Sequence, residues 1–253
     1  MFACRVIALD VHGQLQEIAR VPERPSGLGW LPDGRLVIVS MHDHRLLVLN
    51  GKTLEVYADL RGYCEGPLND MAIDSRGRAY IGNFGFDYPL ITEPKPTGLI
   101  MVGVGRPQIV AEDLLFPNGI AISPDGRTLI VAESYANRLT AFDINIETGA
   151  LSGRRTFAEL GGCSPDGICL DAQGAVWVAS YNTCEFLRVC EDGDITHRIP
   201  ADNRCAVACV TGGLDRKSLY MLTAETNDED FARGKSLCRV TVASVDVPGA
   251  GIP

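Results

Sequence analysis

The sequence predicts an all-β fold of the β-propeller type, and three observations support this prediction. Segments that open with proline recur, and their turn residues Gly34, Gly77, Gly126 and Gly174 are spaced 43, 49 and 48 residues apart. Between these segments lies a second recurring half, made of two short apolar stretches around a polar turn. No long stretch repeats its apolar residues every 3.6 positions, so little helix is expected. A unit of four short antiparallel strands in roughly 40–50 residues is typical of one propeller blade.

The first half of each unit reads as an apolar strand, a glycine turn and a second apolar strand. The copies are PSGLGWLPDGRLVIVS from Pro25, PLNDMAIDSRGRAYIGN from Pro67, PNGIAISPDGRTLIVAES from Pro117, PDGICLDAQGAVWVASYN from Pro165 and an eroded AVACVTGGLDRKSLYMLTA from Ala206. The second half appears as RLLVLNGKTLEVYADL, RLTAFDINIETGALSGRRTFAEL and FLRVCEDGDITHRIPA. Because Gly, Asp and Asn favour tight turns, each half is expected to form a hairpin.

The blade count predicts a propeller of the six-bladed type whose first blade is incomplete. Residues 4–22 match only the outer half of the unit, which gives five and a half blades with the five fuller copies. A propeller has to close because an open end exposes unpaired sheet edges. We therefore expect that an inner half-blade precedes Met1; the alternative is a first blade completed by other strands. Residues 1–253 are expected to form a single domain.

Composition limits the classes of partner. The net charge of -9 argues against nucleic acid and anionic membranes, because phosphate-binding surfaces concentrate Lys and Arg. No apolar run approaches the roughly 18 residues that cross a bilayer, and no basic-then-apolar leader opens the chain. The nine cysteines are scattered without a C-x-x-C motif, which favours reduced thiols in a cytoplasmic protein over a disulfide framework or a zinc site.

Polar residues occupy one equivalent position in four consecutive units. Eight residues before each turn glycine stand Ser26, Asn69, Asn118 and Asp166. Since innermost strands line the central channel of a propeller, these side chains are expected to converge on its axis. Amide, carboxylate and hydroxyl oxygens suit Ca²⁺ or a similar hard cation. The alternative is that these residues cap turns by bonding to nearby backbone.

At these positions the chain resembles the SMP-30/gluconolactonase/LRE family, whose members are six-bladed propellers with a divalent cation on the axis, many of them lactone hydrolases. The motifs LNDMAID, FPNGIAISPDGRTLIVAES and SPDGICLD carry the resemblance. It implies that Asn118 and Asp166 are metal ligands and that Asn69 lies close to the substrate or the metal. It also implies that Asp87, in NFGFD, lines the substrate pocket.

The chain departs from the family pattern at two places. The family's remaining metal ligand is a Glu in a Glu-Gly-Pro motif on the first inner half-blade, which is the part that the repeat count finds missing. Ser26, in RPSGLGW, belongs to the next blade and is assigned to substrate binding instead. Relatives that act on sugar acids carry an Arg two residues before the Asn that matches Asn69, where this chain has Pro67.

These considerations predict a divalent-cation-dependent hydrolase of small lactones. The cofactor is expected to be Ca²⁺, with Zn²⁺, Mg²⁺ and Mn²⁺ as alternatives, and it would polarise the lactone carbonyl and activate water. Asp166 is the expected metal ligand and general base. Because it is the single carboxylate of the four axial residues, we expect weak cation binding that an N-terminal extension strengthens. Two alternatives are a non-catalytic propeller that binds a ligand or partner, and a relative of the strictosidine-synthase-like or organophosphate-hydrolysing propellers.

Overall fold

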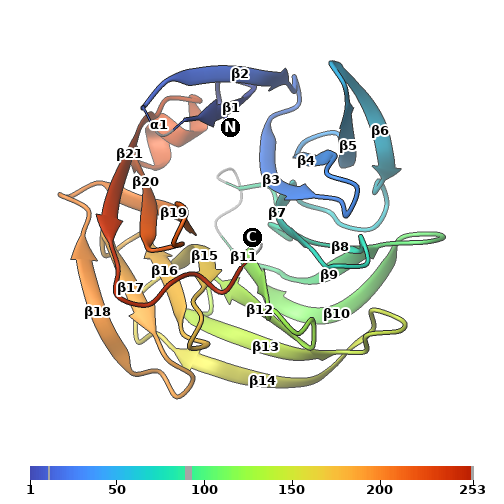
Figure 1. The fold of residues 1–253 in the computed structure, drawn as a ribbon. Coiled ribbons are helices and arrows are strands. Elements are labelled where there is room, and N and C mark those ends of the chain that lie inside the picture. Colours follow the sequence, from blue (N-terminus) through green and yellow to red (C-terminus); the bar gives the residue numbers. More distant parts are fainter. Residues whose placement is uncertain (11, 89–92, 252–253) are drawn as a thin grey trace.

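The strands of the chain are arranged as blades around a central axis. The computed structural model describes residues 1–10, 12–88 and 93–251, and Figure 1 looks down the axis onto sheets that follow one another around it in chain order. Five sheets of three or four antiparallel strands form the blades, and a separate two-stranded sheet stands beside them. The all-β propeller prediction is therefore confirmed.

Four blades have four strands each, and their order across the sheet is the order along the chain. They are β3 (Pro25–Trp30), β4 (Leu36–Ser40), β5 (Arg45–Asn50) and β6 (Thr53–Asp59); β7 (Leu68–Ile73), β8 (Ala79–Asn83), β9 (Pro96–Val102) and β10 (Gln108–Leu115); β11 (Pro117–Ile122), β12 (Thr128–Glu133), β13 (Arg138–Ile144) and β14 (Leu151–Glu159); and β15 (Pro165–Leu170), β16 (Val176–Ser180), β17 (Glu185–Val189) and β18 (Ile195–Pro200). In each blade the first strand lies nearest the axis (Figure 1).

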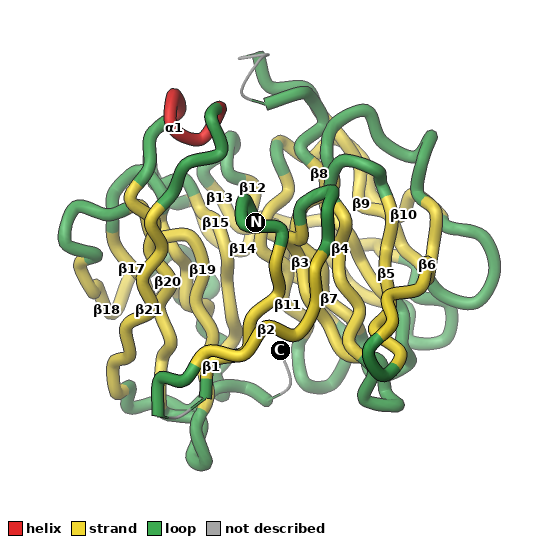
Figure 2. Tube along the Cα trace, turned by 90° about the horizontal axis from the view of Figure 1, so that it is seen from above, coloured by secondary structure: helices red, strands yellow, loops and turns green. Residues whose placement is uncertain are grey.

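The two ends of the described chain depart from the four-stranded pattern. The eroded copy forms β19 (Cys205–Gly212) and β20 (Ser218–Glu225), and β21 (Leu237–Ser244) completes a three-stranded blade after the short helix α1 (Asp228–Ala232). The two-stranded sheet consists of β1 (Arg5–Leu9) and β2 (Leu15–Arg20). Figure 2 shows the loops gathered at the two ends of the strands, with α1 at one end. No helix in the described residues is long and apolar enough to cross a membrane.

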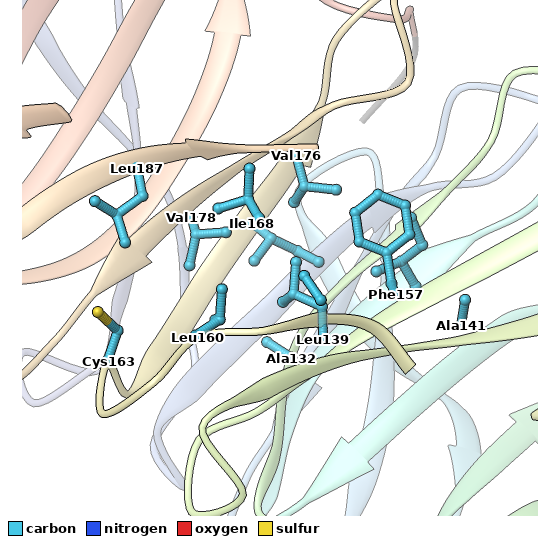
Figure 3. Close-up of a cluster of buried hydrophobic side chains, with 13 residues drawn as sticks. Ala132, Leu139, Ala141, Phe157, Leu160, Cys163, Ile168, Val176, Val178 and Leu187 are labelled. Atoms are coloured by element: carbon cyan, nitrogen blue, oxygen red, sulfur yellow. The ribbon is translucent and has the colours of Figure 1, made fainter. Parts of the chain in front are cut away.

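The hydrophobic core lies in the seams between neighbouring blades. Figure 3 shows one seam, in which Leu139 and Phe157 of the β11–β14 blade meet Ile168, Val178 and Leu187 of the β15–β18 blade. Leu139, Val178 and Leu187 are fully buried. A blade that lies between two others has both faces covered. Its central strands are therefore apolar on both sides and do not alternate between apolar and polar residues, as in the wholly buried β16.

Glycine follows the axial residue in three blades because the inner strands approach each other closely there. A Cβ on Gly119 would lie 2.5 Å from the backbone N of Ile168, and one on Gly167 would lie 2.7 Å from the Cα of Ala208. A Cβ on Gly27 would likewise lie 2.6 Å from the backbone N of Met71. The Pro-x-Gly pattern of the repeats is therefore a consequence of blade-to-blade packing.

The turns between the first two strands of a blade follow the predicted pattern. Gly34, Gly77, Gly126 and Gly174 all have positive φ, between 70° and 86°. In one of these turns the Asp171 carboxylate accepts the N–H groups of Gln173 and Ala175 and is ion-paired with Arg188, with 2.6 Å between Oδ2 and Nη2. Both members of this pair are buried.

Candidate axial site

The four equivalent positions of the sequence repeat come together at one end of the axis. Ser26, Asn69, Asn118 and Asp166 each lie second in the innermost strand of their blade, in β3, β7, β11 and β15 respectively. These strands contact one another in succession, β3 with β7, β7 with β11 and β11 with β15. The shared register places the four residues at the same end of neighbouring strands.

Hydrogen bonds connect the first three of these blades. The Ser26 hydroxyl donates to the backbone carbonyl of Asn69 at 2.6 Å, so it is tied to the next blade. The Asn69 side-chain amide donates to the carbonyl of Pro117 at 3.1 Å, which links it to the third blade. Asn69 is buried, and its N–H donor is used by backbone rather than left free.

Asn118 is positioned by the same kind of contact. Its amide lies 3.2 Å from the Ser134 hydroxyl, and that hydroxyl donates to the Pro165 carbonyl at 2.6 Å. The Asn118 side chain also hydrogen-bonds the Asp166 carboxylate, which accepts the Gly167 N–H as well. Ser134 was not identified from the sequence, although it directly follows the strand that pairs with the Asn118 strand.

A second carboxylate, Asp70, belongs to the site and was not identified from the sequence. Its side chain accepts the Met71 N–H at 2.8 Å, and no ion pair to it exists among the described residues. Burial raises the pKa of Asp70 to about 6, against a smaller opposing effect of the Met71 hydrogen bond. Burial also raises the pKa of Asp166 well above its ordinary value, and the charge of Asp70 raises it further.

The site is therefore more acidic than the four-residue register indicates. Asp70 stands where three other blades have glycine, at Gly27, Gly119 and Gly167. That exception to the Pro-x-Gly pattern is the signal in the sequence that could have drawn attention to it. Asp70 and Asp166 are half-buried carboxylates, and the charge of Asp70 raises the pKa of Asp166, so a cation between or beside them would stabilise the pair.

The donor set fits a hard divalent cation. Asp70 and Asp166 supply carboxylate oxygens and Asn118 an amide oxygen; the Ser26 hydroxyl lies in an inner strand, and the Ser134 hydroxyl, which follows β12, lies beside Asn118. Oxygen ligands of these kinds suit Ca²⁺ or Mg²⁺ better than a thiophilic metal. No group of three or more His, Cys, Asp or Glu side chains suited to a metal occurs in the part of the chain that the structure describes.

Asp87 lies apart from the hydrogen-bonded axial residues. It is exposed, in the segment that follows β8 at the same end of the blades. Two cavities elsewhere in the described chain have no axial residue in their lining: one of about 620 Å³ adjoins residues 225–237, and one of about 190 Å³ adjoins Trp177 and Asp246. The carboxylate pair, rather than either cavity, defines the candidate site.

Comparison with known proteins gives one family for most of the chain. A sequence profile described as SMP-30/Gluconolactonase/LRE-like region matches residues 1–225. Regucalcin of Xenopus laevis is 31% identical over 173 residues, which cover 65% of this chain and 57% of that protein. The chain thus spans less than two thirds of this relative's length. A 6-deoxy-6-sulfogluconolactonase of Pseudomonas putida is 26% identical over 262 aligned positions, covering 100% of this chain and 88% of that protein.

Solved structures show the same fold. A luciferin-regenerating enzyme superimposes with a TM-score of 0.80 at 18% identity, covering 95% of this chain and 85% of that chain. A calcium-binding regucalcin from Agrobacterium tumefaciens superimposes with a TM-score of 0.79 at 23% identity, covering 96% and 82% respectively. At these identities the likeness concerns the propeller itself.

Proposed function

Because the chain belongs to the SMP-30/gluconolactonase/LRE-like family, we propose that it hydrolyses small lactones or related esters with a divalent cation bound on its axis. Relatives named as a gluconolactonase and a 6-deoxy-6-sulfogluconolactonase support the reaction class. The observation that carries the proposal is the pair formed by Asp70 and Asp166, two carboxylates of raised pKa beside the Asn118 amide.

We assign cation binding to Asp166, Asn118 and Asp70. When bound, the cation would polarise the lactone carbonyl and lower the pKa of water. Ca²⁺ is the proposed ion, and the regucalcin neighbour described as calcium-binding supports this choice. The two carboxylates give the site a negative charge that favours a divalent ion over a monovalent one.

Asp166 is the proposed proton acceptor for the attacking water. Its carboxylate is held in place by hydrogen bonds with the Asn118 side chain and the Gly167 N–H. The charge of Asp70 raises the basicity of Asp166, which favours proton transfer from water. Ser26, Asn69 and Asp87 are assigned to the substrate side of the site. Because the Ser26 hydroxyl and the Asn69 amide N–H donate to backbone carbonyls, these two residues would shape the substrate pocket rather than donate to the lactone oxygens.

We further propose that β1 and β2 are the outer half of a sixth blade. Leu28 and Trp30 of β3 are 38% and 48% exposed, whereas the residues that match Leu28 in three other blades are buried and those that match Trp30 are half-buried. Gly27 and Gly29 on the opposite face of β3 pack on Met71 and Ile73, so Leu28 and Trp30 face the side of β2. Two inner strands there would cover this apolar surface. A chain extended at its N-terminus by such a hairpin, with an acidic axial residue, is expected to bind Ca²⁺ more tightly by calorimetry; equal affinity would contradict this.

The function is tested with a panel of lactones and esters assayed with Ca²⁺ and with EDTA. Hydrolysis that stops in EDTA and returns with Ca²⁺ is expected, and Asp166→Asn should lower kcat by about 10²-fold or more. Asp202→Asn removes one carboxylate at an exposed position and serves as the matched control. Hydrolysis that is the same in EDTA, or in Asp166→Asn, would refute the assignment.

A non-catalytic ligand-binding propeller is the second candidate, and Pro67 favours it because sugar-acid relatives have a charged residue there. It predicts Ca²⁺ binding by calorimetry without turnover of any lactone in the panel.

A further inference from the structure

An aromatic cluster stands beside the axial site, at the end of the blades where the inner strands begin. We call it the mouth cluster; it comprises Met41, Phe84, Phe86, Tyr88, Phe116 and Tyr135. Phe84 and Phe116 stack with ring centroids 4.3 Å apart. Tyr135 packs against Phe116 at 5.2 Å and against Phe86 at 5.7 Å. Three blades contribute to the cluster, so it joins neighbouring blades rather than forming the core of one blade.

Backbone hydrogen bonds connect the mouth cluster to the axial residues. The Phe84 N–H donates to the Pro67 carbonyl at 2.9 Å, two residues before Asn69. The Ser134 N–H donates to the Phe116 carbonyl at 3.2 Å, and the Ser134 side chain contacts Asn118. Tyr135 directly follows Ser134 in the chain. A molecule held at the carboxylate pair therefore has aromatic rings as its neighbours.

Tyr135 is the ring that the cluster presents to solvent. It is 40% exposed, whereas Phe86 is 2% and Phe116 is 8% exposed. The backbone at Phe86 is closely packed, because a Cβ on Gly66 would come within 2.6 Å of the Phe86 backbone N. The segment that carries Phe86 thus rests against the residue preceding Pro67. Sugar-acid relatives carry an Arg at the position of Pro67, and in this chain that position has apolar surroundings.

The charge that the mouth cluster itself carries is negative, whereas the proposed Ca²⁺ would balance the two axial carboxylates. Asp70 and Asp166 lie on the axis, and Asp87 is the charged residue within 84–88. Lys95, from the base of the same connection, lies 3.7 Å from Glu65 and is thereby paired. Arg24, next to the first axial strand, lies over the Phe2 ring at 5.0 Å from its centroid. An anionic substituent on a substrate would meet like charge at the mouth cluster.

We propose that the substrate is an uncharged lactone with an apolar or aromatic substituent, which packs against Tyr135 while the lactone group lies at the carboxylate pair. This inference rests on the proposed lactone-hydrolase function and specifies its substrate class. An apolar face excludes polyhydroxylated substituents because their hydroxyls would lose water without gaining partners. Like charge excludes carboxylated and sulfonated ones.

Four lactones that differ in one substituent test the inference. They are γ-butyrolactone and its derivatives with a γ-phenyl, a γ-hydroxymethyl or a γ-carboxylate group, assayed with the full chain in Ca²⁺. The four share the five-membered lactone ring, but the γ-substituent also changes the leaving alkoxide, so each kcat/KM is divided by the rate constant of that lactone for hydroxide-catalysed hydrolysis. The corrected ratio reports on contacts between the substituent and the protein. Burial of a phenyl group against the cluster should raise kcat/KM by about tenfold or more over the parent. The carboxylate should lower it.

Variants locate the effect at Tyr135. Tyr135→Ala should reduce kcat/KM for the phenyl derivative by about tenfold more than it reduces kcat/KM for γ-butyrolactone, which lacks the substituent, whereas Tyr135→Phe should retain the preference. Asp87→Asn should raise kcat/KM for the carboxylate. Equal rates for all four lactones, or a preference that survives Tyr135→Ala, would overturn the inference while leaving lactone hydrolysis established. Hydrolysis of none of them would remove the proposed function itself.

Discussion

Replacing Asp70 by Asn should stabilise the chain when no cation is present. In the folded chain the pKa of the Asp70 carboxyl is about 6, against 3.8 ordinarily, mainly because it is buried. The folded state therefore holds the proton more tightly than the unfolded state, and ionising Asp70 above pH 6 costs stability. A difference of this size corresponds to about 3 kcal/mol. This is an upper bound, because the side chain is half-buried and water in the channel screens part of the penalty.

The stability of the parent chain should therefore fall as the pH rises. In a chelator, the stability contributed by protonated Asp70 is present below about pH 4 and lost as the pH rises through about 6. Asp70→Asn cannot ionise, so its stability should fall less over this interval. At pH 7.5 its Tm should exceed that of the parent chain by up to about 5–10 °C.

Calcium should reverse this advantage. A cation that binds the folded state alone stabilises it by about 2.7 kcal/mol at a hundred times its Kd. Asp70→Asn removes one of the two carboxylates, so Ca²⁺ should raise its Tm by less than that of the parent.

Thermal melts by circular dichroism, with EDTA and with Ca²⁺, measure both effects. Asp202→Asn, at an exposed position, is the control for loss of one negative charge. The reasoning is refuted if Asp70→Asn destabilises the chain in EDTA, or if Ca²⁺ stabilises parent and variant equally.

Three further outcomes are expected. Gly119→Ala should destabilise by about 2 kcal/mol or more, because the added Cβ meets backbone of the next blade at 2.5 Å; an unchanged urea midpoint would contradict the packing. Arg188→Ala should cost about 3–5 kcal/mol by leaving buried Asp171 unpaired, and Arg188→Met with Asp171→Asn should recover much of it; equal loss in the double variant would argue against charge as the cause. A hydrogen bond with Cys169, followed by burial, raises the pKa of Cys209, so a thiol reagent followed by mass spectrometry should label exposed Cys238 long before Cys209; similar rates would contradict the buried position.

The propeller and the axial register could be predicted because both follow from repetition. Evenly spaced turn glycines mark the units, and identical positions in repeated units must occupy equivalent places around an axis. Ser26, Asn69, Asn118 and Asp166 accordingly lie at the starts of four inner strands. The roles assigned to them remain proposals.

Contacts between blades could not be predicted in the same way. Asp70 lies close enough to Asp166 to raise its pKa because of how the two blades are spaced and where the Asp70 side chain points. A repeat pattern contains neither piece of information. The helix α1 was also missed, although Asn227 supplies an N-cap, with its side-chain oxygen accepting the Asp230 N–H at 2.9 Å. Its five residues are too few for helical periodicity to stand out.

The hydrogen bonds from Ser26 to Asn69 and from Asn69 to Pro117 have a consequence for assembly. Their partners are 43 and 48 residues apart in sequence, so neither bond can form until complete neighbouring blades have docked. Asp70 and Asp166 belong to different blades, so an isolated blade cannot bring the two carboxylates together. Affinity for calcium would therefore appear late in folding, and it would report how well the ring of blades has assembled.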